Sequence, residues 1–242
     1  EAIAFDYDGT LAITQGLHEP ARNRAFEIMF ETTGDTRFRD VPKEVHAEAH
    51  RHGSSPHTII GWILQQSEIV PADADLYSHP VVEETVSHKD KAYQDIVGAG
   101  ADAVRGAVDY IQHIDQAMPG QLAIVTTARL DIELRPFLKR HGLEDIFPDS
   151  RITARENVAS LKPDPEAYTR TIQMFGLEDR PDRLLVYEDT GHGIESAKRA
   201  GAFVAALPTT HSVEELEALE GYQRPDVIIP SFADLAARLQ AI

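Results

Sequence analysis

The stretch FDYDGT, Phe5 to Thr10, places two aspartates two positions apart directly after an apolar run and ahead of a glycine. The preceding residues, 2–5, are apolar without interruption, which predicts a strand that is buried on both faces and central in a parallel sheet. Ligands of such sheets bind beyond the carboxyl ends of the strands. Asp6 and Asp8 are therefore predicted to lie at the edge of the sheet where a site would form.

Strand and helix patterns alternate along the later part of the chain. Short apolar runs predict further strands over residues 122–125, 151–153, 184–187, 203–206 and 227–229. Helical spacing predicts helices between them, one of which covers residues 132–141. This alternation predicts an α/β fold, a three-layer Rossmann-like core with a mainly parallel sheet. Residues 14–98 read as helical and polar instead, so we predict an all-helical domain inserted into a core of residues 1–13 and 99–242.

The composition excludes several classes of protein. The chain has 242 residues, of which 40 are acidic and 23 basic, giving a formal charge of -17. A surface that binds nucleic-acid phosphates needs clustered Lys and Arg, so we expect no nucleic-acid partner. No apolar stretch approaches the roughly 20 residues that span a bilayer, so we expect no membrane partner. Because the chain has no cysteine, a reducing, cytoplasmic location is favoured, while the oligomeric state is left open.

Polar side chains follow two more of the predicted strands. Thr126 and Thr127 come directly after LAIV, and Glu188 and Asp189 come directly after LLVY. In the segment LKPDPEAY, Lys162 stands just ahead of a predicted helix. Because the carboxyl ends of parallel strands meet at one edge of the sheet, we expect these residues to gather at the same site as the two aspartates.

The carboxylates of Asp6, Asp8, Glu188 and Asp189 would repel one another at that edge unless a divalent cation compensated their charge. An all-oxygen set of ligands suits Mg²⁺, so the sequence predicts Mg²⁺ as cofactor. The cation would also neutralise an incoming phosphate. Lys162 would supply further positive charge, and the hydroxyl of the threonine after LAIV would supply a hydrogen bond.

These motifs, in this order, resemble the haloacid dehalogenase superfamily of aspartate-nucleophile phosphotransferases. DYDGT matches the first motif, the threonine after AIV the second, Lys162 in KPDP the third and YEDTGHGIESAKRAG the fourth. The resemblance implies that Asp6 attacks phosphorus and becomes an aspartyl-phosphate, while Asp8 protonates the leaving oxygen and later deprotonates the acceptor. It also implies that Mg²⁺ is held by the Asp6 carboxylate, the Asp8 backbone carbonyl and Asp189, with Glu188 nearby or bound through water.

The helical insertion resembles the C1-type cap of this superfamily, and the chain is similar in detail to β-phosphoglucomutase and phosphoglycolate phosphatase. Thr14 and His18 stand at the spacing where those enzymes carry a threonine and a hinge histidine, and Lys89 matches a cap lysine. Closure of such a cap would exclude water and supply specificity. A glycine-containing loop of the cap carries Arg51 and His52, which are interpreted as substrate-selecting residues or, alternatively, as a plain solvated helix end.

One departure from the mutase pattern favours hydrolysis. The mutase carries polar, phosphate-binding side chains after the second motif, whereas this chain has Ala128 and Leu130 there, with Arg129 between them. We expect a Mg²⁺-dependent phosphatase that acts on a small phosphorylated metabolite, a sugar phosphate or a phosphoglycolate-like acid, with Thr127 and Arg129 among the substrate-binding residues. Two alternatives stay open: a phosphosugar mutase, and a non-catalytic protein that binds a phosphorylated metabolite.

Overall fold

The computed structural model describes residues 1–14, 16–49 and 55–240 of the chain. The chain divides into two compact units. The first, which we term the core unit, comprises Glu1–Gln15 and Val97–Ile242, and the second, the helical unit, comprises Gly16–Ile96. The two units are described separately below. That the helical unit acts as a cap stays a prediction.

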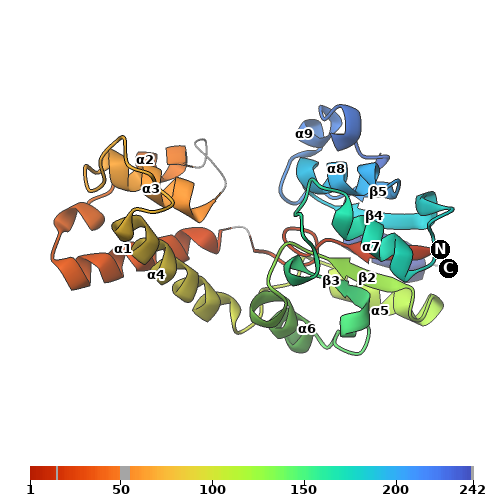
Figure 1. The fold of residues 1–242 in the computed structure, drawn as a ribbon. Helices are drawn as coiled ribbons and strands as arrows, with labels where there is room; N and C mark the ends of the chain where they lie inside the picture. The colour runs from red at the N-terminus through yellow and green to blue at the C-terminus, as the bar shows by residue number, and fades with distance from the viewer. Residues whose placement is uncertain (15, 50–54, 241–242) are drawn as a thin grey trace. The chain divides into compact units, whose positions relative to one another are not determined.

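The core unit is built on a six-stranded sheet in the order β3-β2-β1-β4-β5-β6. Figure 1 labels strands β2, β3, β4 and β5 of this sheet. Its strands are β1 (Ala2–Phe5), β2 (Leu122–Val125), β3 (Ile152–Thr153), β4 (Leu184–Glu188), β5 (Phe203–Ala206) and β6 (Val227–Ile228). Every pairing between these strands is parallel. The predicted α/β fold with a mainly parallel sheet is confirmed, and β1 lies in its interior as its unbroken apolar run predicts.

Helices cover both faces of this sheet. They are α5 (Ala107–Ala117), α6 (Arg135–His141), α7 (Glu166–Met174), α8 (Gly191–Arg199), α9 (Val213–Glu217) and α10 (Phe232–Gln240). Ala4 of β1 is buried in one cluster with Tyr168 of α7. Its neighbour Phe5 packs instead against Tyr110 of α5 and Phe232 of α10, with ring centroids 6.3 and 6.1 Å apart. Because successive side chains of a strand point to opposite faces, these contacts place one helix layer on each side of the sheet.

The segment after β2 differs from the prediction of one helix over residues 132–141. It begins with a π-helical turn, Leu130–Leu134, and only then continues as α6. One tertiary contact accompanies the wider turn, in which the Tyr7 hydroxyl donates to the Glu133 carbonyl at 3.2 Å. Within the segment itself, the Arg129 amide donates to the Glu133 carboxylate at 2.9 Å. Such turns are frequent at functional sites.

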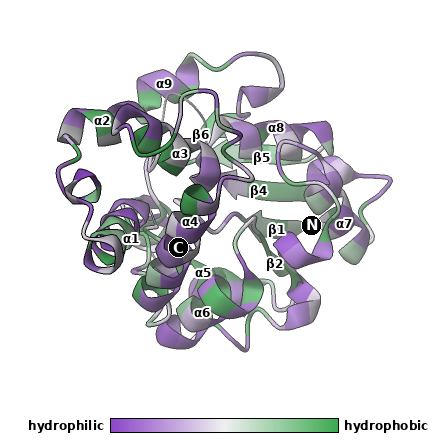
Figure 2. Cartoon of the chain, turned by 60° about the vertical axis from the view of Figure 1, so that its left-hand side comes forward, coloured by the Kyte–Doolittle hydropathy of each residue, from purple (hydrophilic) through white to green (hydrophobic). Residues whose placement is uncertain are grey.

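The helical unit has a core of its own. Its helices are α1 (His18–Thr33), α2 (Lys43–Glu48), α3 (Pro56–Gln66) and α4 (Pro80–Val97), with a short 3₁₀ turn at Thr36–Phe38. Met29 of α1, Ile63 of α3 and Val82 of α4 are buried together, so the apolar stripes of three helices meet. Figure 2 shows strands β4 and β5 in hydrophobic colours, whereas the helices carry both colours along their length. Within the described part of the chain, no helix combines the length and the apolar character needed to cross a membrane.

Candidate active site

Lys162 joins the carboxyl ends of three neighbouring strands. Its Nζ donates to Asp6 Oδ1 at 2.5 Å, to the Val125 carbonyl at 3.0 Å and to Glu188 Oε1 at 2.7 Å. These acceptors follow or end β1, β2 and β4, which are adjacent in the sheet. The side chains of Lys162, Asp6 and Glu188 are only 8%, 9% and 1% exposed. The predicted third motif therefore meets the first and fourth in a buried ion pair, whose attraction is little screened by solvent.

A cluster of buried carboxylates surrounds this lysine. One oxygen each of Asp6, Glu188 and Asp189 lies within 4.8 Å of the other two. Burial, and next the charge of Glu188, raise the pKa of Asp189 to about 7 and raise that of Asp6 well above its ordinary value. The one lysine therefore leaves negative charge uncompensated in the cluster. A compact set of carboxylate oxygens suits a hard divalent cation, so the residues present fit the predicted Mg²⁺.

Asp8 differs from Asp6 in its surroundings. Its side chain is partly exposed, and burial raises its pKa to about 6, against the effect of a side-chain hydrogen bond with Thr14. A carboxyl group with a pKa near 6 can exchange a proton near neutral pH, which is the property that a general acid and base needs. The hydrogen bond between Asp8 and Thr14 thus joins two residues that the sequence analysis selected separately.

The residues after β2 lie at the same edge of the sheet. The hydroxyl oxygen of Thr126, which is buried, accepts a hydrogen bond from the Ala128 amide at 2.8 Å. A hydroxyl that accepts one bond still has its proton to donate, so Thr126 can bind an anionic oxygen. Thr127 is half-buried, and Arg129 Nε lies 3.5 Å from the carboxylate of Glu133. The roles of Thr127 and Arg129 in substrate binding stay predictions.

A comparison with protein families supports the interpretation of these motifs. The family model for haloacid dehalogenase-like hydrolases matches residues 1–201. The chain belongs to this family. It is therefore a hydrolase, and the resemblance of the four motifs to the superfamily is confirmed.

Relatives that align with nearly the whole of this hydrolase include a named phosphatase and a protein crystallised with phosphate. The hydrolase is 29% identical to Protein CbbY of Rhodobacter capsulatus over 94% of this chain and 93% of the relative. Its identity to the phosphorylated carbohydrates phosphatase of Thermotoga maritima is 26%, over 90% and 89% of the two chains. The crystal structure of CbbY from Rhodobacter sphaeroides in complex with phosphate is 26% identical, with a TM-score of 0.65 over 97% of this chain and 96% of that one.

Two solved structures of lower identity share the fold. A predicted phosphoglycolate phosphatase from Haemophilus somnus has a TM-score of 0.73 at 18% identity, covering 98% and 96% of the two chains. A β-phosphoglucomutase from Clostridium difficile has a TM-score of 0.65 at 17% identity, covering 97% and 92%. The predicted likeness of this hydrolase to both kinds of enzyme is therefore confirmed at the level of the fold.

The helical unit of the hydrolase brings two of the predicted residues together around Tyr93. The ring of His18 stacks on that of Tyr93, with centroids 4.4 Å apart and planes at 9°. Lys89 Nζ lies 4.9 Å from the centre of the same ring. Arg51 and His52 lie outside the described residues. The roles of these residues in substrate binding stay predictions.

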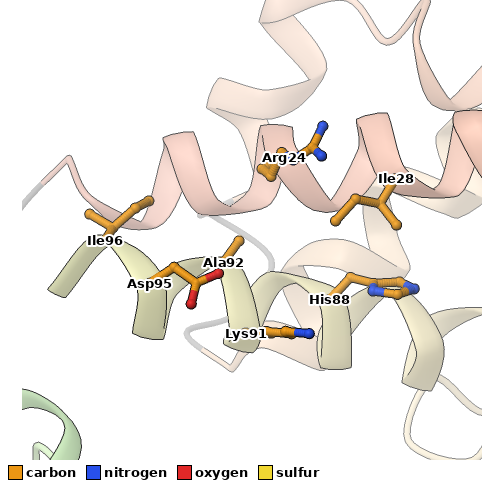
Figure 3. Close-up of a pocket in the computed structure, with 7 residues that line it drawn as sticks. All are labelled: Arg24, Ile28, His88, Lys91, Ala92, Asp95 and Ile96. Carbon is orange, nitrogen blue, oxygen red and sulfur yellow. The ribbon is translucent and has the colours of Figure 1, made fainter. Parts of the chain in front are cut away.

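The helical unit also contains a cavity of about 560 Å³. It lies between α1 and α4 and is lined by Arg24, Ile28, His88, Lys91, Ala92, Asp95 and Ile96 (Figure 3). This set shares no residue with the predicted site. Arg24 is already paired with Glu27 and Glu31 on its own helix, at 3.0 and 3.4 Å.

Tyr168 contacts two of the predicted site residues, although the sequence analysis did not select it. Its hydroxyl donates to Glu188 Oε1 at 2.7 Å, and Lys162 Nζ lies 5.0 Å from the centre of its ring. The same oxygen of Glu188 thus accepts from both residues. A tyrosine on the apolar face of a predicted helix reads as core, so its place directly after KPDPEA was the one signal available.

Gly193 allows Glu188 its position, because a Cβ atom at residue 193 would lie 2.0 Å from both carboxylate oxygens of Glu188. We expect Gly193→Ala to displace Glu188 from Lys162 and to lower the free energy of unfolding by about 1–3 kcal/mol, as overpacking of a core does. Urea denaturation monitored by circular dichroism measures this change. Gly191→Ala in the same helix is the control, since its nearest atom would be Gln223 Oε1 at 3.3 Å. Equal stability of the two variants would contradict the placement of Glu188.

Proposed function

We propose that this hydrolase removes the phosphoryl group from a small phosphorylated sugar, with Asp6 as the nucleophile. The observation that carries the proposal is the buried contact of Lys162 Nζ with Asp6 Oδ1 beside the other carboxylates of the sheet edge. The family supports hydrolysis. The name of the Thermotoga maritima relative supports a phosphorylated sugar as substrate, and the phosphate bound to CbbY from Rhodobacter sphaeroides supports binding of a phosphoryl group.

The proposed reaction has two transfers. In the first, a carboxylate oxygen of Asp6 attacks phosphorus, the bond between phosphorus and the sugar oxygen breaks, and Asp8 gives its proton to that oxygen. In the second, Asp8 takes a proton from water, whose oxygen attacks the phosphorus of the aspartyl-phosphate. Inorganic phosphate leaves and the carboxylate of Asp6 is regenerated. The pKa of Asp8, near 6, suits both directions of proton transfer.

The remaining residues of the site would bind and orient. Lys162 holds the carboxylate of Asp6 by its hydrogen bond and favours its ionised form. Thr126 lies after β2 with a hydroxyl that can donate to a phosphoryl oxygen. Glu188 accepts from Lys162 and from Tyr168, so we assign it to the orientation of Lys162.

Mg²⁺ is the cofactor in this proposal. The carboxylates of Asp6 and Asp189 and the backbone carbonyl of Asp8 would hold it, with Glu188 close by. When bound, Mg²⁺ would neutralise negative charge on the phosphoryl oxygens.

We expect Mg²⁺ to raise the melting temperature more at about pH 8 than at about pH 5.5. Without a cation, burial and Glu188 raise the pKa of Asp189 from 3.8 to about 7. Between pH 3.8 and about 7, the carboxyl group of Asp189 is ionised in the unfolded chain but protonated in the folded protein. The free energy of unfolding therefore falls as the pH rises through this range. Mg²⁺ binds the ionised carboxylate, so above pH 7 it has no proton to displace and restores the lost stability. Differential scanning calorimetry with MgCl₂ or EDTA measures the shift, and an equal shift at both pH values would contradict this account.

Phosphorus NMR of the purified protein with Mg²⁺ and a panel of sugar phosphates and phosphoglycolate tests the function. The panel includes β-glucose 1-phosphate with a trace of its bisphosphate. We expect free phosphate to grow at the expense of one or more esters. Conversion of one ester into another without free phosphate would establish a phosphosugar mutase instead. Binding of Mg²⁺ and phosphate without any turnover would establish the non-catalytic alternative.

A further inference from the structure

Asp189 is fully buried, and threonine hydroxyls donate to both of its carboxylate oxygens. Thr10 Oγ1 donates to Oδ1 at 3.1 Å, and Thr210 Oγ1 donates to Oδ2. Thr10 belongs to the loop of the nucleophile, after β1. Thr210 lies in the loop between β5 and α9, a part of the chain in which the sequence analysis selected no site residue.

The loop that carries Thr210 is fixed against the strand that carries Asp189. The Leu207 amide donates to the Glu188 carbonyl at 2.8 Å, which continues the pairing of β5 with β4 up to the site. Gly9 closes the third side, because a Cβ atom there would lie 2.1 Å from Asp189 Oδ2 and 2.6 Å from Thr210 Oγ1. Asp189 is therefore held by two hydroxyls, and the backbone of the nucleophile loop passes close to its carboxylate.

We propose that Thr210 is a positioning residue of the cation site, which acts through Asp189 by fixing the direction in which this carboxylate presents its oxygens to Mg²⁺. The inference rests on the proposed function, in which Asp189 is a ligand. Each carboxylate oxygen has lone pairs for both a hydrogen bond and a cation, so the bond from Thr210 is compatible with ligation. Removal of such an outer partner typically weakens metal binding about 10–100-fold.

The test is isothermal titration calorimetry of Mg²⁺ into the purified 242-residue chain. We expect Thr210→Val, which keeps the size of the side chain and removes the hydroxyl, to raise the dissociation constant for Mg²⁺ at least about tenfold. Thr210→Ser keeps the hydroxyl and should bind within about twofold of the natural protein. Thr209→Val is the matched control, since Thr209 is the adjacent residue and is exposed; it should leave the dissociation constant unchanged.

A kinetic measurement separates positioning from general damage. In Thr210→Val, the Mg²⁺ concentration for half-maximal phosphate release should rise by the same factor as the dissociation constant. The KM for the phosphate ester, and kcat at saturating Mg²⁺, should stay within about twofold of the natural values, because the ligand itself is retained. A fall in kcat at saturating Mg²⁺ with an unchanged requirement for Mg²⁺ would overturn the inference.

The outcomes distinguish the inference from the function on which it rests. If the natural protein binds Mg²⁺ and Thr210→Val binds it equally tightly, the inference is wrong while the proposed function stands. If Thr210→Ser fails to restore binding, the hydroxyl is not the acting group and the inference is also wrong. If the natural protein binds no Mg²⁺, the cofactor in the proposed function is wrong, and the inference falls with it.

Discussion

Asp6→Asn is expected to lower phosphate release on the order of 10⁴-fold or more, because the amide that replaces the carboxylate is no nucleophile toward phosphorus. The substitution preserves the size of the side chain in a closely packed site, where the side chain of Asp6 is 9% exposed. It should also abolish trapping by beryllofluoride, which needs the same carboxylate oxygen. Release of inorganic phosphate from the best ester of the panel, and fluorine NMR with beryllofluoride, measure the two effects.

The control for this experiment is Asp73→Asn, an exposed aspartate of the helical unit. It undergoes the same chemical change far from the cluster in sequence and should release phosphate at the natural rate. A second check is the thermal unfolding of Asp6→Asn, which should remain a single cooperative transition. Phosphate release by Asp6→Asn at a rate near the natural one would remove Asp6 as the nucleophile.

Lys162→Met is expected to damage both activity and stability. The side chain of Lys162 contacts two carboxylates that are 9% and 1% exposed, those of Asp6 and Glu188. Removing one partner of a buried ion pair leaves an unpaired charge and typically costs about 3–5 kcal/mol of stability. In the proposed function Lys162 holds the carboxylate of the nucleophile, so its loss should lower turnover about 10²–10³-fold. Urea denaturation in EDTA and assays of phosphate release in Mg²⁺ measure the two losses separately.

Addition of Mg²⁺ makes the Lys162→Met experiment more specific. A divalent cation at the carboxylates should compensate part of the lost charge, so Mg²⁺ should restore some of the stability but little of the turnover. Lys139→Met, at an exposed position of α6, is the matched control and should change neither quantity. If Lys162→Met were as stable in EDTA as the natural protein, Lys162 would not be buried between Asp6 and Glu188 in solution.

The predictions that the structure confirms depend on short-range patterns. The unbroken apolar run of residues 2–5 predicted an interior strand, because a strand that is covered on both faces exposes no side chains to solvent and needs no polar residues. The alternation of such runs with helical patterns predicted a parallel sheet. A parallel sheet then places the ends of its strands at one edge, so the positions of Asp6, Thr126 and Glu188 followed from the sequence alone.

Other features could not be predicted from the sequence because they depend on contacts between distant segments. The π-helical turn at Leu130–Leu134 is one example, since a hydrogen bond from Tyr7 helps to shape a segment that reads as ordinary helix. Tyr168 reads as a core residue, and Thr210 reads as an ordinary loop residue. The sequence around Tyr168 does not indicate its hydrogen bond to Glu188, and the sequence around Thr210 does not indicate its hydrogen bond to Asp189.

By itself, the sequence determined the class of fold, the strand ends that form the site and the acidic and basic groups that meet there. These follow from local periodicity and from motifs of a few residues. Only the tertiary structure decided which carboxylates the Nζ atom of Lys162 contacts, and which residues donate hydrogen bonds to Asp189. The order of β1, β4 and β5 in the sheet brings Thr10, Asp189 and Thr210 together. That adjacency is set by packing between segments far apart in the chain, so no local stretch of residues encodes it.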